Sequence, residues 1–269
     1  MTLEWLLPLP VLLAACQTTA TRPAETAVAP AQTLHVLTSG GFTSAFKALS
    51  THYEHVAGGK VVAGYGPSMG DTPNAIPQRL ARHEPADVVI LARSALDALA
   101  ASGAIVAGSE VDLGLSKIAV AVKAGAPTPD ISTPDALRAT LLNAKSVAWS
   151  DSASGVYIQS VLLQKLGVAD QVRAKGRMIP AAPVGEIVAH GDAEIGFQQL
   201  SELKPIKGIR IVGLLPDSLQ KVTPFSAGVV SYSPNQAGAR ALITYLSSSK
   251  ADASIRASGL EPAPRKAQP

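Results

Sequence analysis

The sequence predicts an α/β fold in which two lobes, each a mostly parallel sheet flanked by helices, enclose a ligand cleft. From residue 33 onward, apolar segments of strand length alternate with longer amphipathic segments, which is typical of sheets covered by helices. The roughly 235 residues of this region suffice for one large domain or two lobes of ordinary size. One design, a short strand followed by glycine and hydroxyl residues and then a helix, occurs in both halves.

Strands and helices alternate through the first half of this region. We expect strands at Leu34–Leu37, Val61–Tyr65, Ala86–Leu91 and Lys117–Lys123, and helices at Thr43–Val56, Thr72–Arg82 and Ala95–Ser102. Pro127 and Pro129 end the last of these strands, because proline has no N–H to donate to a sheet. A further helix begins after Thr133, a preferred N-cap residue, with Pro134 at its first position.

The second half continues the alternation. Its predicted elements are Ser146–Trp149, a helix over residues 156–166, Arg177–Ile179, Val184–Ala189, Glu194–Phe197 and Arg210–Leu214. Val222–Tyr232 is a long apolar segment, and Ala237–Ser247 is the last predicted helix.

Two turns between a strand and a helix are suited to bind an anion. The first contains Ser39, Gly40 and Gly41, and the second contains Ser152, Ala153, Ser154 and Gly155. The start of a helix leaves N–H groups unpaired and carries a partial positive charge, so it attracts anions. Small residues let a ligand approach the backbone, and the hydroxyl groups add donors. We therefore expect both turns to hold one small anion between the lobes.

The amino terminus predicts export. Leu6–Ala15 is too short an apolar run to span a bilayer and is typical of a signal peptide, although Met1–Glu4 contains no Lys or Arg. Cys16 follows a leucine and two alanines, which resembles the lipobox of bacterial lipoproteins; the alternative is an apolar tail with an incidental cysteine. Residues 1–16 are thus expected to be leader and lipobox, and residues 17–32 a disordered tether rich in Thr, Ala and Pro. The chain would be periplasmic, anchored through a lipid on Cys16.

Composition argues against several classes of protein. The net charge is only +3, aromatic residues make up 4%, and no basic run is interleaved with aromatics, so nucleic-acid binding is not expected. Cys16 is the one cysteine, which leaves no internal disulfide and no thiolate metal site. The five histidines show no ligand spacing. We therefore expect no metal and no other cofactor. We also expect a monomer, because the sequence offers no clear surface for oligomerisation.

Four motifs together resemble the periplasmic type 2 solute-binding proteins of the molybdate-binding branch. They are the turn Thr38–Thr43, the run His83–Val88, the turn Ala153–Tyr157 and the run Gly191–Gly196. The resemblance covers roughly residues 33–262. It implies a two-lobed fold with a cleft, in which residues 33–114 and 226–269 form lobe 1 and residues 115–225 form lobe 2. The chain would cross between the lobes near 114–118 and 222–226.

The sequence departs from that family at the residues that bind the oxyanion. The resemblance implies ligand contacts from the position of Gly41, from Ser68 and Met69 in a longer loop, from Val184, and from Gln198 and Gln199. Gly41 stands where the family has its first serine, and Gln199 stands at the tyrosine position. Losing a hydroxyl donor widens the site, and glutamine adds an acceptor. These changes favour a ligand larger than molybdate, with several carboxylates.

Two functions follow from the resemblance. The chain is similar to the aconitate isomerase offshoot of this branch, periplasmic enzymes that interconvert trans- and cis-aconitate. Alternatively, it captures molybdate or another oxyanion or carboxylate for an ABC permease without catalysis. The fold alone does not decide between them.

An allylic proton shift requires a base beside the substrate and donors for the carboxylate that takes up negative charge. Glu186 is the first choice for the base, because it follows Pro183-Val184-Gly185, a ligand-contacting stretch in the relatives. Glu202 and Asp151 are the alternatives. A guanidinium or ammonium group suits a further carboxylate, and the candidates are Arg79, Arg93, Arg177 and Lys221.

Overall fold

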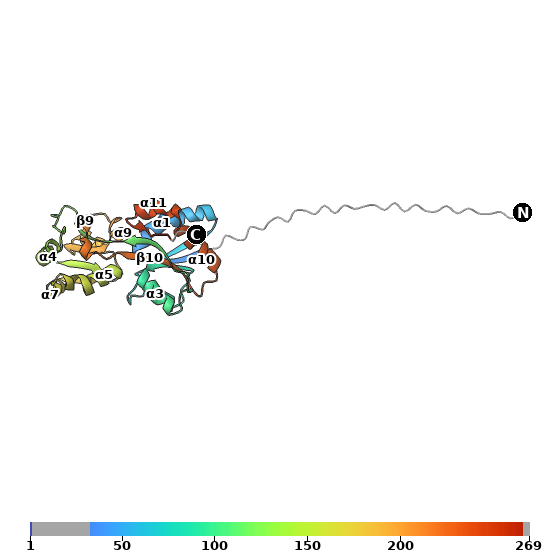
Figure 1. The fold of residues 1–269 in the computed structure, drawn as a ribbon, viewed down its shortest axis with the longest axis horizontal. Coiled ribbons are helices and arrows are strands. Elements are labelled where there is room, and N and C mark those ends of the chain that lie inside the picture. The colour runs from blue at the N-terminus through green and yellow to red at the C-terminus, as the bar shows by residue number, and fades with distance from the viewer. Residues whose placement is uncertain (2–32, 266–269) are drawn as a thin grey trace. The chain divides into compact units, whose positions relative to one another are not determined.

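The computed structural model describes Met1 and residues 33–265. The predicted signal peptide, lipobox and tether therefore lie outside the described residues, apart from Met1. The described residues 33–265 belong to one compact unit, which contains two sheets (Figure 1). We call the part built on the first sheet lobe 1 and the part built on the second sheet lobe 2.

The sheet of lobe 1 has six strands in the order β11-β4-β10-β3-β1-β2. Their bounds are β1 Thr33–Thr38, β2 Lys60–Tyr65, β3 Val88–Ala92, β4 Val111–Ser116, β10 Thr223–Val229 and β11 Glu261–Pro262. Strand β1 pairs in parallel with β2 and β3, whereas β10 pairs antiparallel with β3 and β4. Strand β3 is buried at every position, as expected for a strand covered on both faces.

The sheet of lobe 2 has five strands in the order β7-β6-β8-β5-β9. They are β5 Ile118–Lys123, β6 Val147–Ser150, β7 Gly176–Ile179, β8 Ile195–Gln199 and β9 Ile209–Leu214. Strand β6 pairs in parallel with β7 and β8, and β5 pairs antiparallel with β8 and β9.

The two-lobed α/β fold is confirmed, but each sheet is mixed rather than mostly parallel. Apart from the short pair β11–β4, the antiparallel pairs all involve β5 or β10, and these share one physical origin. Strands β5 and β10 enter their sheets directly from the other lobe, so no helical crossover within the sheet imposes a parallel direction on them.

Helices cover both sheets. Those of lobe 1 are α1 Gly40–Ala57, α2 Ile76–Ala81, α3 Arg93–Ala101, α10 Gln236–Leu246, the short η3 Ser249–Ala251 and α11 Asp252–Ala257. Those of lobe 2 are α4 Pro134–Asn143, α5 Ala153–Tyr157, the π-helical η1 Ile158–Leu162, α6 Leu163–Lys165, α7 Ala169–Arg173, α8 Val184–His190, α9 Leu200–Leu203 and η2 Asp217–Leu219. Because α5, η1 and α6 follow one another without a break, residues 153–165 form one helical segment.

Local sequence signals explain where two of these helices begin. The Thr133 hydroxyl accepts the N–H of Ala136 at 3.1 Å, so α4 begins with the predicted N-cap. Helix α2 begins at Ile76 rather than at Thr72, because residues 72–75 form a turn in which the Ala75 N–H reaches the Thr72 carbonyl.

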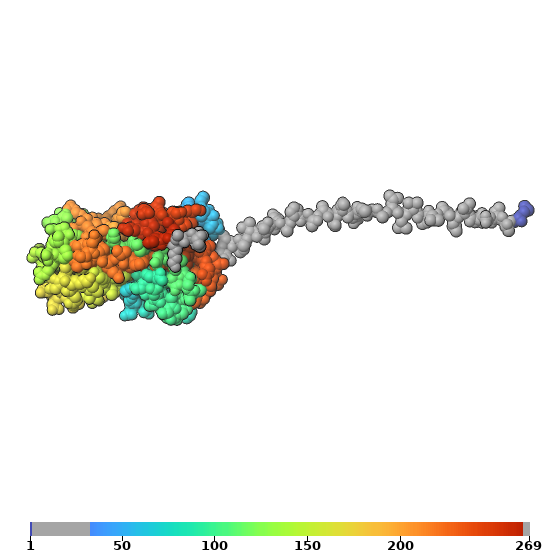
Figure 2. Space-filling model, viewed as in Figure 1, coloured from blue at the N-terminus to red at the C-terminus, as the bar shows by residue number. Residues whose placement is uncertain are grey.

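Each lobe has its own apolar core. In lobe 1, Phe42 and Phe46 of α1 pack with strands β1, β3 and β10. In lobe 2, Trp149 and Phe197 pack between the sheet and helices α4 to α7. In Figure 2 the lobes differ in colour, since lobe 1 combines the two ends of the described chain and lobe 2 takes its middle.

The chain passes between the sheets twice. Lys117 alone separates β4 from β5, and residues 215–222 connect β9 to β10. The lobes also meet beside these crossings, where the hydroxyl of Ser201 on α9 donates to the Gly41 carbonyl on α1 at 2.7 Å. This arrangement brings the first turn of α1 against α9 and leaves a cleft in front of them.

Candidate functional site

A cavity of about 290 Å³ lies between the lobes. Its lining comes from both lobes and consists mainly of small and polar residues. Lobe 1 contributes Gly40, Thr43, Ser44, Tyr65, Gly66, Pro67 and Asn74. Lobe 2 contributes Ser150, Asp151, Ser152, Ala181, Ala182, Pro183, Gln198, Ser201, Glu202, Pro205 and Ile206.

The first turn of α1 faces this cavity with unpaired donors. Ser39 is its N-cap residue, but its side chain makes no capping hydrogen bond. The Phe42 N–H donates to the Ser39 carbonyl at 3.1 Å, whereas the N–H groups of Gly40 and Gly41 have no partner among the described residues. The dipole of this 18-residue helix favours negative charge beside them. The Thr43 hydroxyl donates to the Ser39 carbonyl at 3.0 Å, which holds the turn in place.

The loop before α5 presents a second set of donors from lobe 2. The Ser150 and Ser154 hydroxyls lie 3.0 Å apart, and the Ser152 hydroxyl accepts the N–H of Ser68 in lobe 1 at 3.3 Å. Gly155 permits this loop to close, because a Cβ there would lie 1.5 Å from the Ser150 carbonyl oxygen. The two predicted anion-binding turns thus lie on opposite sides of one cleft.

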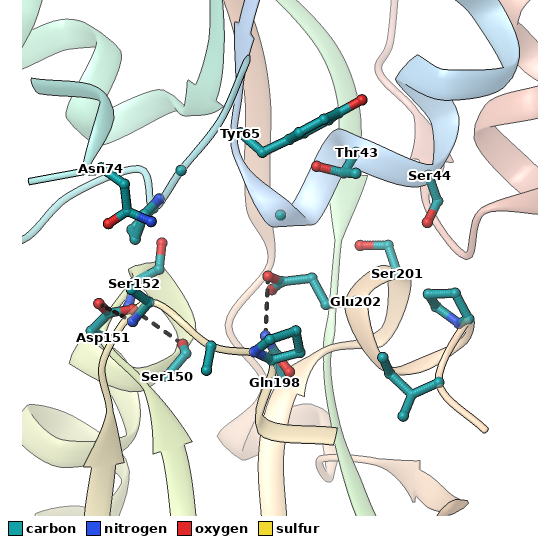
Figure 3. A pocket seen from close by; sticks show the side chains of 18 residues that line it. Thr43, Ser44, Tyr65, Asn74, Ser150, Asp151, Ser152, Gln198, Ser201 and Glu202 are labelled. Carbon is teal, nitrogen blue, oxygen red and sulfur yellow. Dashed lines mark hydrogen bonds between the residues drawn. The ribbon is translucent and has the colours of Figure 1, made fainter. Parts of the chain in front are cut away.

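Glu202 points into the cleft between these two turns (Figure 3). Gln198 donates to its Oε1 at 3.1 Å. A Cβ added to Gly40 would lie 2.0 Å from the same oxygen, so a glycine in the first turn of α1 makes room for this carboxyl group. Glu202 of lobe 2 is therefore packed directly against lobe 1.

Burial raises the pKa of Glu202 to about 7, because removal from water disfavours the charged form. The hydrogen bonds from the Gln198 side chain and the Gln199 backbone act in the opposite direction, and the negative charge of Asp151 adds to the rise. A carboxyl group that titrates near neutral pH in a cleft is suited to act as a general base or acid.

The raised pKa of Glu202 predicts a pH-dependent stability. The folded chain holds this proton up to about pH 7, while the unfolded chain releases it near 4.5. The free energy of unfolding therefore falls as the pH rises between these values. Glu202→Gln mimics the protonated group, so the variant should be more stable than the wild type at pH 8 and equal to it at pH 4. Urea unfolding at both pH values measures this, and equal stability at pH 8 would contradict the raised pKa.

Three of the predicted ligand-binding residues line the cavity, namely Gly40, Ser152 and Gln198, and so do Asp151 and Glu202, the two alternatives for the base. Gly41, the next residue after Gly40, is not part of the lining. A Cβ on Gly41 would lie 2.0 Å from the Phe225 ring. Its small size is thus required by packing in lobe 1. Ser39 is buried beside it, and its hydroxyl has no hydrogen-bond partner among the described residues.

The remaining residues of the predicted turns and loops support the cleft from outside. The Ser68 hydroxyl accepts the N–H of Ala92, and Met69 packs against the apolar cluster under β3. Val184 is buried, and its N–H donates to Gln198 Oε1 at 2.9 Å. Ala153, Ser154 and Gly155 form the first turn of α5 and lie outside the cavity lining.

Gln199 points away from the cleft. Consecutive side chains of a strand face opposite sides, and the Gln199 amide reaches the Thr223 hydroxyl at 3.4 Å, where β10 begins. Gln199 thus contacts the point where the chain enters β10 after crossing from lobe 2. The cavity lining contains its neighbour Gln198 but not Gln199.

Glu186 is not brought into the cleft. Its side chain is exposed in the first turn of α8, and it is absent from the cavity lining. The four cationic candidates also lie outside this lining: Arg79 pairs with Glu84, Arg93 with Asp97 and Asp112, Arg177 reaches the Asp192 carbonyl, and Lys221 is exposed.

Several polar residues of the lining were not predicted from the sequence. Thr43 and Ser44 lie on the face of α1 that Gly40 begins, so helical spacing from Gly40 could have indicated them. Lys47, one turn further on, has its ammonium 5.1 Å from the centre of the Tyr65 ring. Asn74 lies in the turn before α2. The sequence there indicates a turn but does not indicate that Asn74 faces the cavity.

Within the described ranges, no three His, Cys, Asp or Glu side chains gather as metal ligands. A helix of the length and hydropathy required to cross a bilayer is not found among the residues that the structure describes.

The comparisons define the class of protein. Residues 34–261 match the family model described as bacterial extracellular solute-binding protein, and the chain belongs to this family. A curated relative, an aconitate isomerase from Pseudomonas sp., is 54% identical over 243 residues, which cover 90% of this chain and 92% of the relative. Membership in an extracellular family agrees with the expected location outside the cytoplasm.

Solved structures confirm the fold. The periplasmic molybdate-binding protein of Azotobacter vinelandii is 22% identical with a TM-score of 0.70, covering 86% of this chain and all of its own. The substrate-binding domain of a putative molybdenum ABC transporter from Clostridium difficile is 19% identical with a TM-score of 0.64, over 87% of this chain and all of its own. At these identities the likeness concerns the fold alone.

Proposed function

We propose that this chain is an aconitate isomerase that interconverts trans- and cis-aconitate by an allylic proton shift. The 54% identity to an enzyme of that name supports the reaction. The observation that carries the proposal is Glu202, a carboxyl group with a pKa near neutral that points into a cleft of donors.

The reaction requires only a proton to move. Glu202 takes a proton from the methylene carbon of aconitate as that C–H bond breaks, and the electrons delocalise over the adjacent alkene and its carboxylates. A proton then returns to the former alkene carbon, which becomes the new methylene group. No oxidant, reductant or co-reactant is consumed, and the geometry of the new double bond decides between the cis and trans products.

The cleft is suited to hold carboxylates by neutral donors. None of the described side chains that line it is a lysine or an arginine. Gly40 at the start of α1 and Ser152, the residue before α5, both line the cleft, and Ser44 and Ser152 add hydroxyl groups. Such fixed dipoles stabilise charge that develops on a carboxylate during proton removal.

Glu202 is a better base than the two other acidic candidates. Glu186 is exposed outside the cleft lining. Asp151 lines the cleft, but its Oδ2 accepts the N–H of Ala181 at 2.9 Å. We assign Asp151 the role of holding the loop around residue 181, where Ala181 adopts a left-handed backbone with φ +52°.

Turnover of purified protein tests the proposal. Incubation with trans-aconitate in D₂O should yield cis-aconitate with deuterium at the methylene carbon. Chromatography detects the product, and NMR detects the deuterium. Absence of both product and deuterium exchange, together with a rise in melting temperature on adding molybdate or tungstate, would favour the transport role instead.

The second candidate function is capture of an anionic solute for an ABC permease. The family description and the molybdate-binding neighbours favour it. A chain that binds without catalysis would still fit the extracellular setting, and a lipid on Cys16 would keep it near a permease.

Ligand stabilisation separates the two ligand classes. At a hundredfold excess over its dissociation constant, trans-aconitate should raise the free energy of unfolding by about 2.7 kcal/mol, while molybdate should leave it unchanged. Thermal denaturation with each anion at constant ionic strength measures this. Stabilisation by molybdate but not by aconitate would contradict the proposed substrate.

A further inference from the structure

Gln198 contacts two parts of the site at once. Its Oε1 accepts the N–H of Val184, at the start of α8, at 2.9 Å, and its Nε2 donates to Glu202 Oε1 at 3.1 Å. The side chain is only 4% exposed. It is the penultimate residue of β8, the central strand of the lobe 2 sheet.

The contact with Val184 fixes which way the Gln198 amide faces. Turning the amide over would place its NH₂ group against the Val184 N–H and its oxygen against the Glu202 carboxylate, and both contacts would be repulsive. The backbone of α8 therefore ensures that Glu202 always meets a donor and never an acceptor.

We infer that Gln198 is a positioning residue, which uses its bond to Val184 to hold the Glu202 carboxyl group in the cleft and to favour its ionised form. The inference rests on the proposed function only in so far as Glu202 is the base. The hydrogen bond from Gln198 opposes the effect of burial on Glu202, since a donor stabilises the charged form.

The backbone of Gln199 also favours the ionised form of Glu202 through a hydrogen bond, but a side-chain substitution at position 198 leaves that bond in place. Asp151 and Tyr65 are the other titratable residues of the cavity lining, and Asp151 acts in the opposite direction through its negative charge. Helix α1 contributes Gly40, Thr43 and Ser44 to the lining, none of which titrates near neutral pH. Removal of the Gln198 amide should therefore raise the pKa of Glu202.

The test is Gln198→Met, which retains the length of the side chain but removes its donor and acceptor. Carbon-13 NMR of labelled glutamate carboxyl groups follows the Glu202 titration, and the resonance is assigned by its loss in Glu202→Gln. We expect the Glu202 midpoint to rise by about one pH unit. The acidic limb of the pH profile of kcat/KM should move by the same amount.

The matched control is Gln199→Met, which replaces the neighbouring glutamine that contacts Thr223. This control should leave the titration midpoint of Glu202 unchanged.

If Gln198→Met does not fold, Gln198→Glu retains an acceptor for the Val184 N–H and is tested in the same way, with an upward shift of the Glu202 midpoint expected. An unchanged Glu202 midpoint in a folded Gln198 variant overturns the inference. If the wild type does not isomerise aconitate, the proposed function fails, while the titration still decides the role of Gln198.

Discussion

Replacing Glu202 by glutamine is expected to lower kcat for aconitate isomerisation by a factor of about 10² to 10⁴, the range that general-base catalysis contributes. The amide has nearly the same shape as the carboxyl group and fills the same space beside Gly40, but it cannot accept a proton. The affinity for trans-aconitate should change much less than kcat, because the donors of both turns remain. Initial rates and calorimetric binding measure the two effects separately.

The decisive comparison for this variant is Glu186→Gln. Glu186 is exposed in the first turn of α8, so its replacement should leave turnover at the wild-type value. If Glu186→Gln abolishes turnover and Glu202→Gln does not, the assignment of the base has to return to Glu186.

Gly155→Ala is expected to destabilise the chain by about 3 kcal/mol or more. The added methyl group would lie 1.5 Å from the carbonyl oxygen of Ser150 and 2.9 Å from its nitrogen. Both atoms belong to backbone at the end of β6, which is held in the sheet and cannot move aside as a flexible side chain would. Chemical denaturation of the variant measures the loss.

Gly213→Ala is the matched control for this prediction. Gly213 lies in β9 of the same lobe, and a methyl group there would meet Ile131 at an ordinary contact distance of 3.6 Å. The control should unfold within about 1 kcal/mol of the wild type. Equal stability of the two variants would show that the loop at Ser150 can relax around a larger residue.

Much of the fold could be predicted from local patterns. Leu34–Leu37 and Val61–Tyr65 are strands at almost the predicted bounds, and Thr133 caps α4 as its sequence indicates. Strand β4 was missed, because Val111–Ser116 alternates weakly and includes Gly114 and Asp112. It is stabilised by pairing with β10, more than a hundred positions later in the chain, and such pairing leaves no local signal.

The candidate site could be predicted only in outline. Gly40 and Ser152, one residue from each of the two predicted turns, line the cavity, whereas the other residues of those turns do not. Sequence could not decide between Gln198 and Gln199, since adjacent strand residues face opposite sides. It also could not separate Glu186 from Glu202, because both lie in the first turn of a short helix and differ only in what another part of the chain places around them.

Glu202 belongs to lobe 2, but its carboxyl group is covered by lobe 1, because Gly40 of α1 lies against it. Any movement that separated α1 from α9 would let water reach this group and return it to the ordinary acidity of a glutamate. Its readiness to take a proton is therefore tied to a shut cleft, and an empty, open molecule would hold a weaker base.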